Sequence, residues 1–325
     1  MARKRSPVPG PSLRLMQDSS GTILIGSDDA DNAIRCAGDL LAPRRAVVAY
    51  VWDSLSELLL HTDIDHLTGS MKEAAKGLDS EDASGADRIA ARGAELAEAA
   101  GFDAVATIAR GRPKAWPTLL ELAKQHGAAM VVVGSRGLGR VESALLGSVS
   151  SGVLGHAHLP VLIVPALEEA HAPGPVVIGY DGSAHADAAV EAAGRLLRVR
   201  EAVLQTVWTS YRAVASAGVA GAPVAVVTKA AEEIDRGARE GAQHTAEQGA
   251  RLAAAQGLEV QAEAVEADGN AWHTLLDTAH EHRAAAVVVG SRGMSAFESA
   301  LLGSVSRALV HHAPAPVLVV RPPER

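Results

Sequence analysis

The sequence predicts an α/β protein built from two tandem domains, each a doubly wound parallel sheet with helices on both faces. One sign is a long repeat, because adding 156 to a residue number maps Trp52 onto Trp208 and Pro160 onto Pro316. An offset that stays constant over this length indicates two copies of one domain, since solenoid units are only about 20–50 residues long. The other sign is the alternation of short β-branched runs with longer stretches rich in Ala, Leu and Glu, which is typical of βα units.

The expected strands follow this alternation in order. In the first copy they are residues 22–26, 46–51, 104–109, 129–133 and 161–164. In the second copy they are residues 176–180, 202–207, 260–265, 285–289 and 317–320. Several are continuous apolar runs, which is typical of strands covered on both faces. Helical stretches such as 86–100 and 230–255 lie between them, and the alternation predicts parallel strands joined by right-handed crossovers.

Domain boundaries are expected where the composition changes. Residues 1–20 contain Pro, Gly, Ser and one basic run, and we expect a flexible, solvated tail rather than a targeting or nucleic-acid segment. The stretch 166–175 contains AHAPGP, which is typical of a linker. The expected domains are therefore residues 21–167 and 168–325.

Composition narrows the classes of function. The chain has 325 residues, of which 48% are hydrophobic, so each half can bury its own core. A net charge of −8 disfavours a nucleic-acid partner, because phosphate backbones are bound by clusters of Lys and Arg. Apolar runs fall short of the roughly 18–20 residues that span a bilayer, so we expect a cytoplasmic protein without a membrane partner. Cys36 is the only cysteine, which excludes an intrachain disulfide and a Cys-based zinc site.

One phrase occurs twice, as GSRGLGRVESALLGS from Gly134 to Ser148 and as GSRGMSAFESALLGS from 290 to 304. Its first part follows a buried strand, at the edge where open α/β sheets bind ligands, and glycine lets the backbone approach a ligand closely. Its second part begins a helix at Gly147, with Ser148 as the expected N-cap and the hydroxyls of Ser148 and Ser150 as further donors. Free N–H groups at a helix start favour anions. Simple strand ending and helix capping are the alternative, but repetition of the whole phrase favours a phosphate site.

The pattern Gly-x2-Gly-x9-Gly-Ser resembles the nucleotide motif of the universal stress protein family, in its tandem two-domain form. The resemblance covers nearly all of residues 21–321, including the VVIGYDGSAHADAAV opening of the second copy and the PVLIV and PVLVV endings. It implies a five-stranded parallel sheet of order 3-2-1-4-5 in each domain. It also implies ATP, or else ADP or AMP, across the carboxyl edge of the sheet, and Mg²⁺ is a possible companion of ATP.

The resemblance implies nucleotide contacts at matching positions of the two copies. The two valines that end the second strands would offer backbone groups to adenine, and the glycine phrase would hold ribose and phosphates. In the first domain the implied contacts are Gly26, Ser27, Asp28, Val51, Gly134, Arg136, Gly137, Gly147, Ser148, Val149 and Ser150. In the second domain they are Gly179, Tyr180, Asp181, Val207, Gly290, Arg292, Gly293, Gly303, Ser304, Val305 and Ser306. The first copy is three residues shorter after its aspartate, so the second site is the better match.

Other residues allow two interpretations. Trp52 and Trp208 could shield the base, although packing at the sheet edge is favoured. His156 and His158, and the pair His311-His312, could suggest a metal, but such histidines without a neighbouring carboxylate or thiol favour surface turns, so no metal site is expected. Trp116 and Trp272 should belong to the core.

Enzymatic motifs do not stand out. The sequence has neither a Gly-x-Ser-x-Gly elbow nor a P-loop. Arg136 and Asp28 could serve as a phosphate clamp and a metal carboxylate, but nothing evident would orient a nucleophile, so no catalytic residue is predicted. The favoured function is a stress-response protein in which nucleotide occupancy sets conformation or partner choice. A slow ATPase and a dimerisation scaffold with vestigial loops are the alternatives.

The last strand of each copy should lie at a sheet edge. Residues 161–164 and 317–320 each follow a proline, and exposed edges invite pairing. The resemblance implies dimerisation through this strand, so the two halves should pair within one chain. A homodimer is a further possibility.

Overall fold

The computed structural model describes residues 21–26, 31–42, 44–53, 69–111, 114–135, 146–166, 174–211, 224–267, 269–294 and 302–322. The first half contains β1 (Ile23–Gly26), α1 (Asp31–Leu40), β2 (Arg45–Asp53), α3 (Gly69–Ala99), β3 (Asp103–Gly111), α4 (Ala115–Gln125), β4 (Met130–Gly134), α5 (Ser148–His156) and β5 (Val161–Val164). The second half contains β6 (Val176–Gly179), α6 (Ala184–Leu196), β7 (Glu201–Trp208), α8 (Val224–Ala255), β8 (Glu259–Glu266), α9 (Ala271–Glu281), β9 (Ala286–Gly290), α10 (Ser304–His312) and β10 (Val317–Val320). The tail 1–20 lies outside the described residues.

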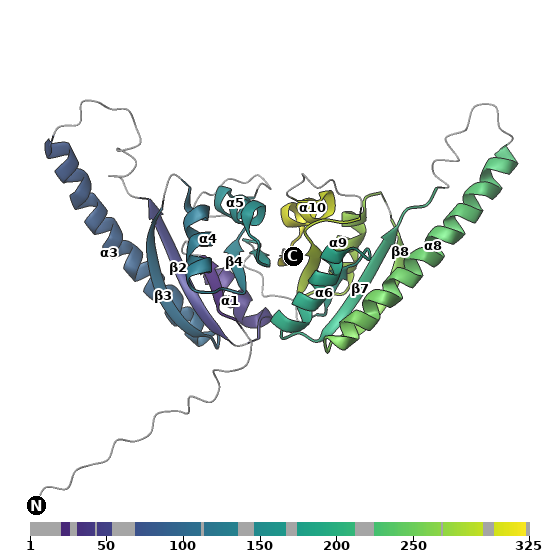
Figure 1. Cartoon of the computed structure of the whole chain (residues 1–325), viewed down its shortest axis with the longest axis horizontal. Helices are drawn as coiled ribbons and strands as arrows, with labels where there is room; N and C mark the ends of the chain where they lie inside the picture. Colours follow the sequence, from purple (N-terminus) through teal and green to yellow (C-terminus); the bar gives the residue numbers. More distant parts are fainter. Residues whose placement is uncertain are drawn as a thin grey trace, which may run out of the picture.

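The strands form a single sheet with the order β3-β2-β1-β4-β5-β10-β9-β6-β7-β8. Read inward from its outer edge, each half has the expected order 3-2-1-4-5, and the pairs within each half are parallel. The predicted fold class is therefore confirmed. Figure 1 shows the two halves side by side, with α3 and α8 at the outer ends.

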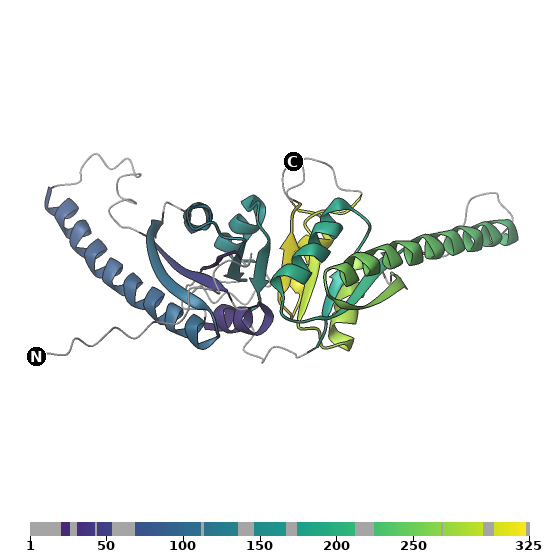
Figure 2. The same ribbon diagram turned by 60° about the horizontal axis from the view of Figure 1, so that its bottom comes forward.

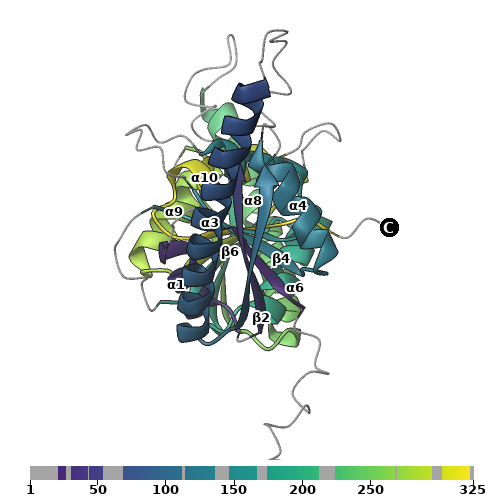
Figure 3. The same ribbon diagram turned by 90° about the vertical axis from the view of Figure 1, so that its left-hand side faces the viewer.

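Burial on both faces explains why the inner strands are continuous apolar runs, whereas the outer strands β3 and β8 are partly exposed. One core cluster covers the face under α1, α3, α6 and α8, and a second covers the face under α4, α5, α9 and α10. Figure 3, which views the molecule from one end, shows helices on both sides of the sheet. Strands enclosed in this way need apolar side chains at successive positions, because both of their faces are buried.

The two long helices begin earlier than the sequence predicts. α3 starts at Gly69 rather than near residue 86, and α8 starts at Val224 rather than near residue 230. Figure 2 shows both helices extending outward from the sheet. The first turns of α3 read GSMKEAAKGLDSEDASG, which has few apolar positions and therefore no helical periodicity to recognise.

The two halves pair through their last strands, as expected. β5 and β10 are antiparallel, with Leu162 opposite Leu318. A second junction lies after the first helix of each half, where the Ala42 N–H donates to the Leu196 carbonyl at 3.1 Å and the Arg198 N–H donates to the Leu40 carbonyl at 2.8 Å. The strand edges that would otherwise be exposed thus become the centre of a continuous sheet.

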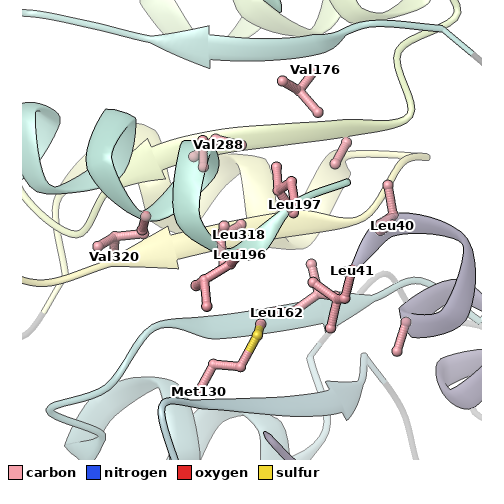
Figure 4. Close-up of a cluster of buried hydrophobic side chains, with 14 of the residues drawn as sticks. Leu40, Leu41, Met130, Leu162, Val176, Leu196, Leu197, Val288, Leu318 and Val320 are labelled. Carbon is pink, nitrogen blue, oxygen red and sulfur yellow. The ribbon is translucent and has the colours of Figure 1, made fainter. Parts of the chain in front are cut away.

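The core is also continuous across this junction. Leu162 of β5 and Leu318 of β10 belong to one buried cluster with Leu41 and Leu197, which follow α1 and α6 (Figure 4). Burial of large aliphatic side chains is the main source of folding free energy. The two halves should therefore depend on each other for stability. Among the described helices, none is both long and apolar enough to cross a membrane.

Candidate functional site

A cavity of about 470 Å³ opens at the carboxyl edge of the second half of the sheet. It lies where β6, β7 and β9 end and where α9 and α10 begin. Its wall includes every residue predicted for the second domain, which are Gly179, Tyr180, Asp181, Val207, Gly290, Arg292, Gly293, Gly303, Ser304, Val305 and Ser306. The structure therefore brings together a set that the sequence spreads over four segments.

Helix α10 points its amino end into the cavity wall. The N-cap is Gly303, with φ −67° and ψ 161°, and among the described residues no side chain caps the helix. The same holds for α5, whose N-cap is Gly147 and not the predicted Ser148. An N-cap residue needs extended backbone, and glycine supplies it without adding a side chain over the first turn. The positive end of the helix dipole is thus left facing the cavity.

Two hydrogen bonds in each domain join the two ends of the repeated phrase, which are the end of a strand and the start of a helix. The Gly303 N–H donates to the Ser291 carbonyl at 2.7 Å, and the Ser306 hydroxyl donates to the Gly290 carbonyl at 2.6 Å. In the first domain the Gly147 N–H donates to the Ser135 carbonyl at 2.8 Å, and the Ser150 hydroxyl donates to the Gly134 carbonyl. Because the proton of each hydroxyl is already donated, Ser150 and Ser306 do not supply the free hydroxyl donors that the sequence suggested. Their side chains instead tie the helix start to the strand end.

Asp181 links the end of β6 to the segment after β9. One carboxylate oxygen accepts from the Ser183 N–H at 3.0 Å, and the other accepts from the Met294 N–H at 2.9 Å. A Cβ at Gly293 would lie 2.6 Å from the second oxygen, so a side chain at this position would have to displace the carboxylate. Gly182 has φ +79°, a left-handed conformation that glycine adopts without strain.

Part of the cavity wall is apolar. Val207, Ala271, Leu275 and Leu302 contribute to its wall. Trp208, in contrast, is not among the described residues that line the cavity: it is 7% exposed, and the Arg239 guanidinium lies 5.3 Å from its ring centroid. Packing is therefore the role that the structure gives to Trp208, and Trp52 has the same arrangement with Arg110 at 5.4 Å.

Gln205 is a wall residue that the sequence reasoning missed. It is 1% exposed, and its Nε2 donates to Glu263 Oε1 at 3.1 Å and to Thr278 Oγ1 at 2.6 Å. Its Oε1 has no hydrogen-bond partner among the described residues, and neither has Thr274 Oγ1. A polar residue within the apolar run AVLQTVW was the available signal, since buried polar groups usually need a stated reason.

Arg292 brings a positive charge to the end of the cavity where Asp181 brings a negative one. Arg292 lines the wall, and His185 Nδ1 lies 3.0 Å from the buried Ser291 hydroxyl. Burial lowers the pKa of His185, the charges of Arg292 and Arg321 lower it further, and Asp181 opposes them. The imidazole is thus held toward its neutral form, so Arg292 and the α10 dipole supply the positive field at the cavity.

Comparison with known proteins agrees with this architecture. A family model for the Universal stress protein family matches residues 22–165 and 174–321. The chain belongs to the universal stress protein family. A universal stress protein of Mycobacterium tuberculosis H37Rv is 36% identical over 214 residues, covering 64% of this chain and 63% of the relative. The matched part is thus less than two thirds of that relative's length.

Two further universal stress proteins extend the comparison. One from Bacillus subtilis is 32% identical over 146 residues, covering 45% of this chain and 97% of the relative. The crystal structure of one from Archaeoglobus fulgidus DSM 4304 aligns with a TM-score of 0.58 at 23% identity, covering 94% of this chain and 97% of that chain. This structural likeness supports the tandem fold.

The corresponding site of the first universal stress domain is described only in part. Gly26, Val51, Gly134 and the helix start from Gly147 to Ser150 lie at the same ends of β1, β2, β4 and α5 as their counterparts in the second domain. The remaining predicted residues lie outside the described residues, and they are Ser27, Asp28, Arg136 and Gly137.

The histidines singled out in the sequence stack on tryptophans. His156 ends α5 and lies 4.1 Å from Trp116 between ring centroids, and His312 ends α10 and lies 4.9 Å from Trp272. Both tryptophans pack against the core cluster under α4 and α9, as expected. These two histidines are therefore helix-terminal rather than turn residues. Within the described ranges, no three His, Cys, Asp or Glu side chains are grouped so that they could hold a metal ion.

Proposed function

We propose that this universal stress protein binds an adenine nucleotide at the carboxyl edge of each domain, and that occupancy sets its conformation or its choice of partner in the cytoplasm. The observation that supports this most strongly is the shared cavity of the eleven residues predicted for the second domain. Its volume, about 470 Å³, falls in the range of about 300–1,000 Å³ that is usual for small-molecule sites.

The chemistry of the wall favours a nucleotide with its phosphates at α10. The uncapped helix start at Gly303 offers N–H groups and a positive dipole, and Arg292 adds a full positive charge. The apolar wall formed by Val207, Ala271 and Leu275 suits a flat base. Mg²⁺ would accompany ATP mainly through the phosphates, since this ion usually keeps several waters when it binds with a nucleotide.

Regulation requires that nucleotide binds two states of the protein unequally. The segment from β9 through the phrase to α10 is the element that occupancy would affect first, because it contributes most of the proposed phosphate contacts. A pairing scaffold without nucleotide is the second candidate, and the β5–β10 junction favours it because that contact involves no cavity residue. The two candidates differ in one measurable property, which is affinity for nucleotide.

Calorimetric titration with ATP, ADP and AMP tests the proposal, using Gly303→Val and a matched Gly241→Val control. A Cβ at Gly303 would lie 3.4 Å from Arg292 Cα and from the Ser291 carbonyl, and the two further methyls of valine would crowd the phosphate end. Gly241 lies on α8 with open space around it. We expect binding by the wild type and the control, and loss of second-domain binding in Gly303→Val. If the wild type binds none of the three nucleotides, the scaffold function is correct instead.

A further inference from the structure

Asp181 holds two separate segments at the phrase end of the cavity. Its carboxylate accepts one backbone hydrogen bond from Ser183, two residues on, and one from Met294, 113 positions away in the chain. We call these two hydrogen bonds the Asp181 clamp. The first is a local turn contact, whereas the second connects the end of β6 with the segment that follows β9.

The clamp fixes one side of Arg292, and the strand fixes the other. On the strand side, the Ser291 N–H donates to the Val320 carbonyl at 2.7 Å, and the Ser291 hydroxyl contacts His185. On the far side, Met294 is bonded to Asp181, and Gly293 passes so close to the carboxylate that a Cβ would lie 2.6 Å from it. The backbone that carries Arg292 is therefore held at both ends before any ligand arrives.

We propose that Asp181 is a positioning residue, which raises nucleotide affinity by holding residues 291–294 so that Arg292 meets the phosphates. This inference rests on the proposed function of the cavity. Holding a segment in its bound conformation raises affinity, because the ordering cost is met before binding. A direct contact between the Asp181 carboxylate and a phosphate would be repulsive, because both groups are negatively charged. The two carboxylate oxygens instead accept hydrogen bonds from backbone N–H groups.

The test compares ATP with adenosine, which lacks the phosphates that Arg292 would meet. All variants are made in a Gly147→Val background, so that titration reports the second domain. We expect Asp181→Ala to weaken ATP binding about tenfold more than it weakens adenosine binding, as loss of a charge-assisted hydrogen bond that positions Arg292 would. Asp181→Asn should be intermediate, since an amide can accept one of the two bonds but not both.

Two further variants separate positioning from general damage. Ser183→Ala removes the N-cap acceptor for the Ala186 N–H but leaves the clamp, so it should preserve the ratio of ATP to adenosine affinity. Gly293→Ala should weaken ATP binding by pushing its Cβ against the carboxylate, and it should do little in the Asp181→Ala protein, where that carboxylate is gone. Equal losses for ATP and adenosine, or additive effects of the two substitutions, would overturn the proposal.

Hydrogen exchange of the nucleotide-free protein gives a readout that does not depend on binding. The Met294 amide should exchange about tenfold or more faster in Asp181→Ala than in Ser183→Ala, because only the first loses the bond that protects it. Unchanged exchange would refute the clamp itself. If the Met294 amide is protected as expected but the protein binds no ATP, the proposed function is wrong and the clamp remains correct. The two failures can therefore be told apart.

Discussion

The two domains share the hydrogen bonds that join the ends of the repeated phrase, but the side chains around the phrase differ. In both, the strand end and helix start are joined by an N–H from glycine and a hydroxyl from serine, at Gly147 and Ser150 in one and Gly303 and Ser306 in the other. In the wall of its site, however, the second domain has the buried Gln205, where the first domain has Ala49 at the matching position. Both domains therefore need the hydrogen bonds between the strand end and the helix start, whereas the residues that line the site differ between the copies.

The domains also differ in how they contact each other. Arg321 follows β10, and its Nη2 donates to the Leu154 and Gly155 carbonyls near the end of α5 at 2.8 and 3.1 Å. The matching position in the first domain is Pro165, whose carbonyl accepts from Asn32 and which has no N–H to donate. A cation near helix-terminal carbonyls is stabilising, so this contact supports the first domain from the second and has no symmetric counterpart at Pro165.

The largest expected effect comes from truncating a side chain in the hydrophobic core that the two domains share. Leu318→Ala should destabilise the protein by about 2–5 kcal/mol, because the side chain is fully buried and leaves a cavity. Since the cluster spans both halves, urea unfolding should remain a single transition at a lower midpoint. Ile234→Ala on α8, which removes a half-exposed side chain, is the control and should change the midpoint little. Unfolding of the second domain alone would show that the halves are independent.

The next effect tests the shared hydrogen bonds in the two domains. Ser306→Ala and Ser150→Ala should each cost about 1–3 kcal/mol, because each leaves a strand-end carbonyl without its hydroxyl donor. Thermal denaturation measures both, with Ser151→Ala as a more exposed control on α5. If only one of the two substitutions lowers the stability, the hydrogen bond from the serine hydroxyl does not have the same role in the two domains.

A smaller effect is expected where the domains are asymmetric. Arg321→Met should cost about 0.5–1.5 kcal/mol per lost hydrogen bond and should speed amide exchange in α5 more than in α10. Arg307→Met is the matched control, since the Arg307 guanidinium donates a long hydrogen bond of 3.4 Å to the Leu302 carbonyl within its own domain. Equal acceleration of exchange in both helices would contradict a one-sided support.

The smallest effect concerns pH. The pKa of His185 is lowered in the folded protein, so the unfolded chain binds the proton more readily, and stability should fall as the pH drops below about 6.5. His185→Gln should remove that part of the pH dependence, which urea titrations at pH 7.5, 6.5 and 5.5 would reveal. His244→Gln, an exposed substitution on α8, serves as the control. The same slope in both variants would mean that other groups control it.

Sequence patterns anticipated the parts of the molecule that depend on local composition. The inner strands were visible as apolar runs because they are buried on both faces, and the residues of the second site followed from their resemblance to a known motif. The true N-cap at Gly147 was missed, because a serine beside it is the commoner cap and only the backbone angles distinguish them.

Other features depend on contacts between distant segments, which no local pattern encodes. The Ser306 hydroxyl meets a carbonyl 16 residues earlier, Asp181 meets Met294 across 113 residues, and Arg321 meets α5 in the other domain. The early turns of α3 were missed for the opposite reason. They carry little apolar periodicity, so the sequence offered no helical pattern there.

A crystal structure of the full chain grown with saturating ATP would show directly whether the cavity of the second domain is the nucleotide site. We expect the base to lie against Val207, Ala271 and Leu275, and the phosphates to lie at the N–H groups of residues 304–306 beside Arg292. ATP bound elsewhere, or a cavity that remains empty at saturation, would contradict this expectation. In that case the repeated phrase would serve to join each strand to its helix, and the paired sheet would be the functional unit.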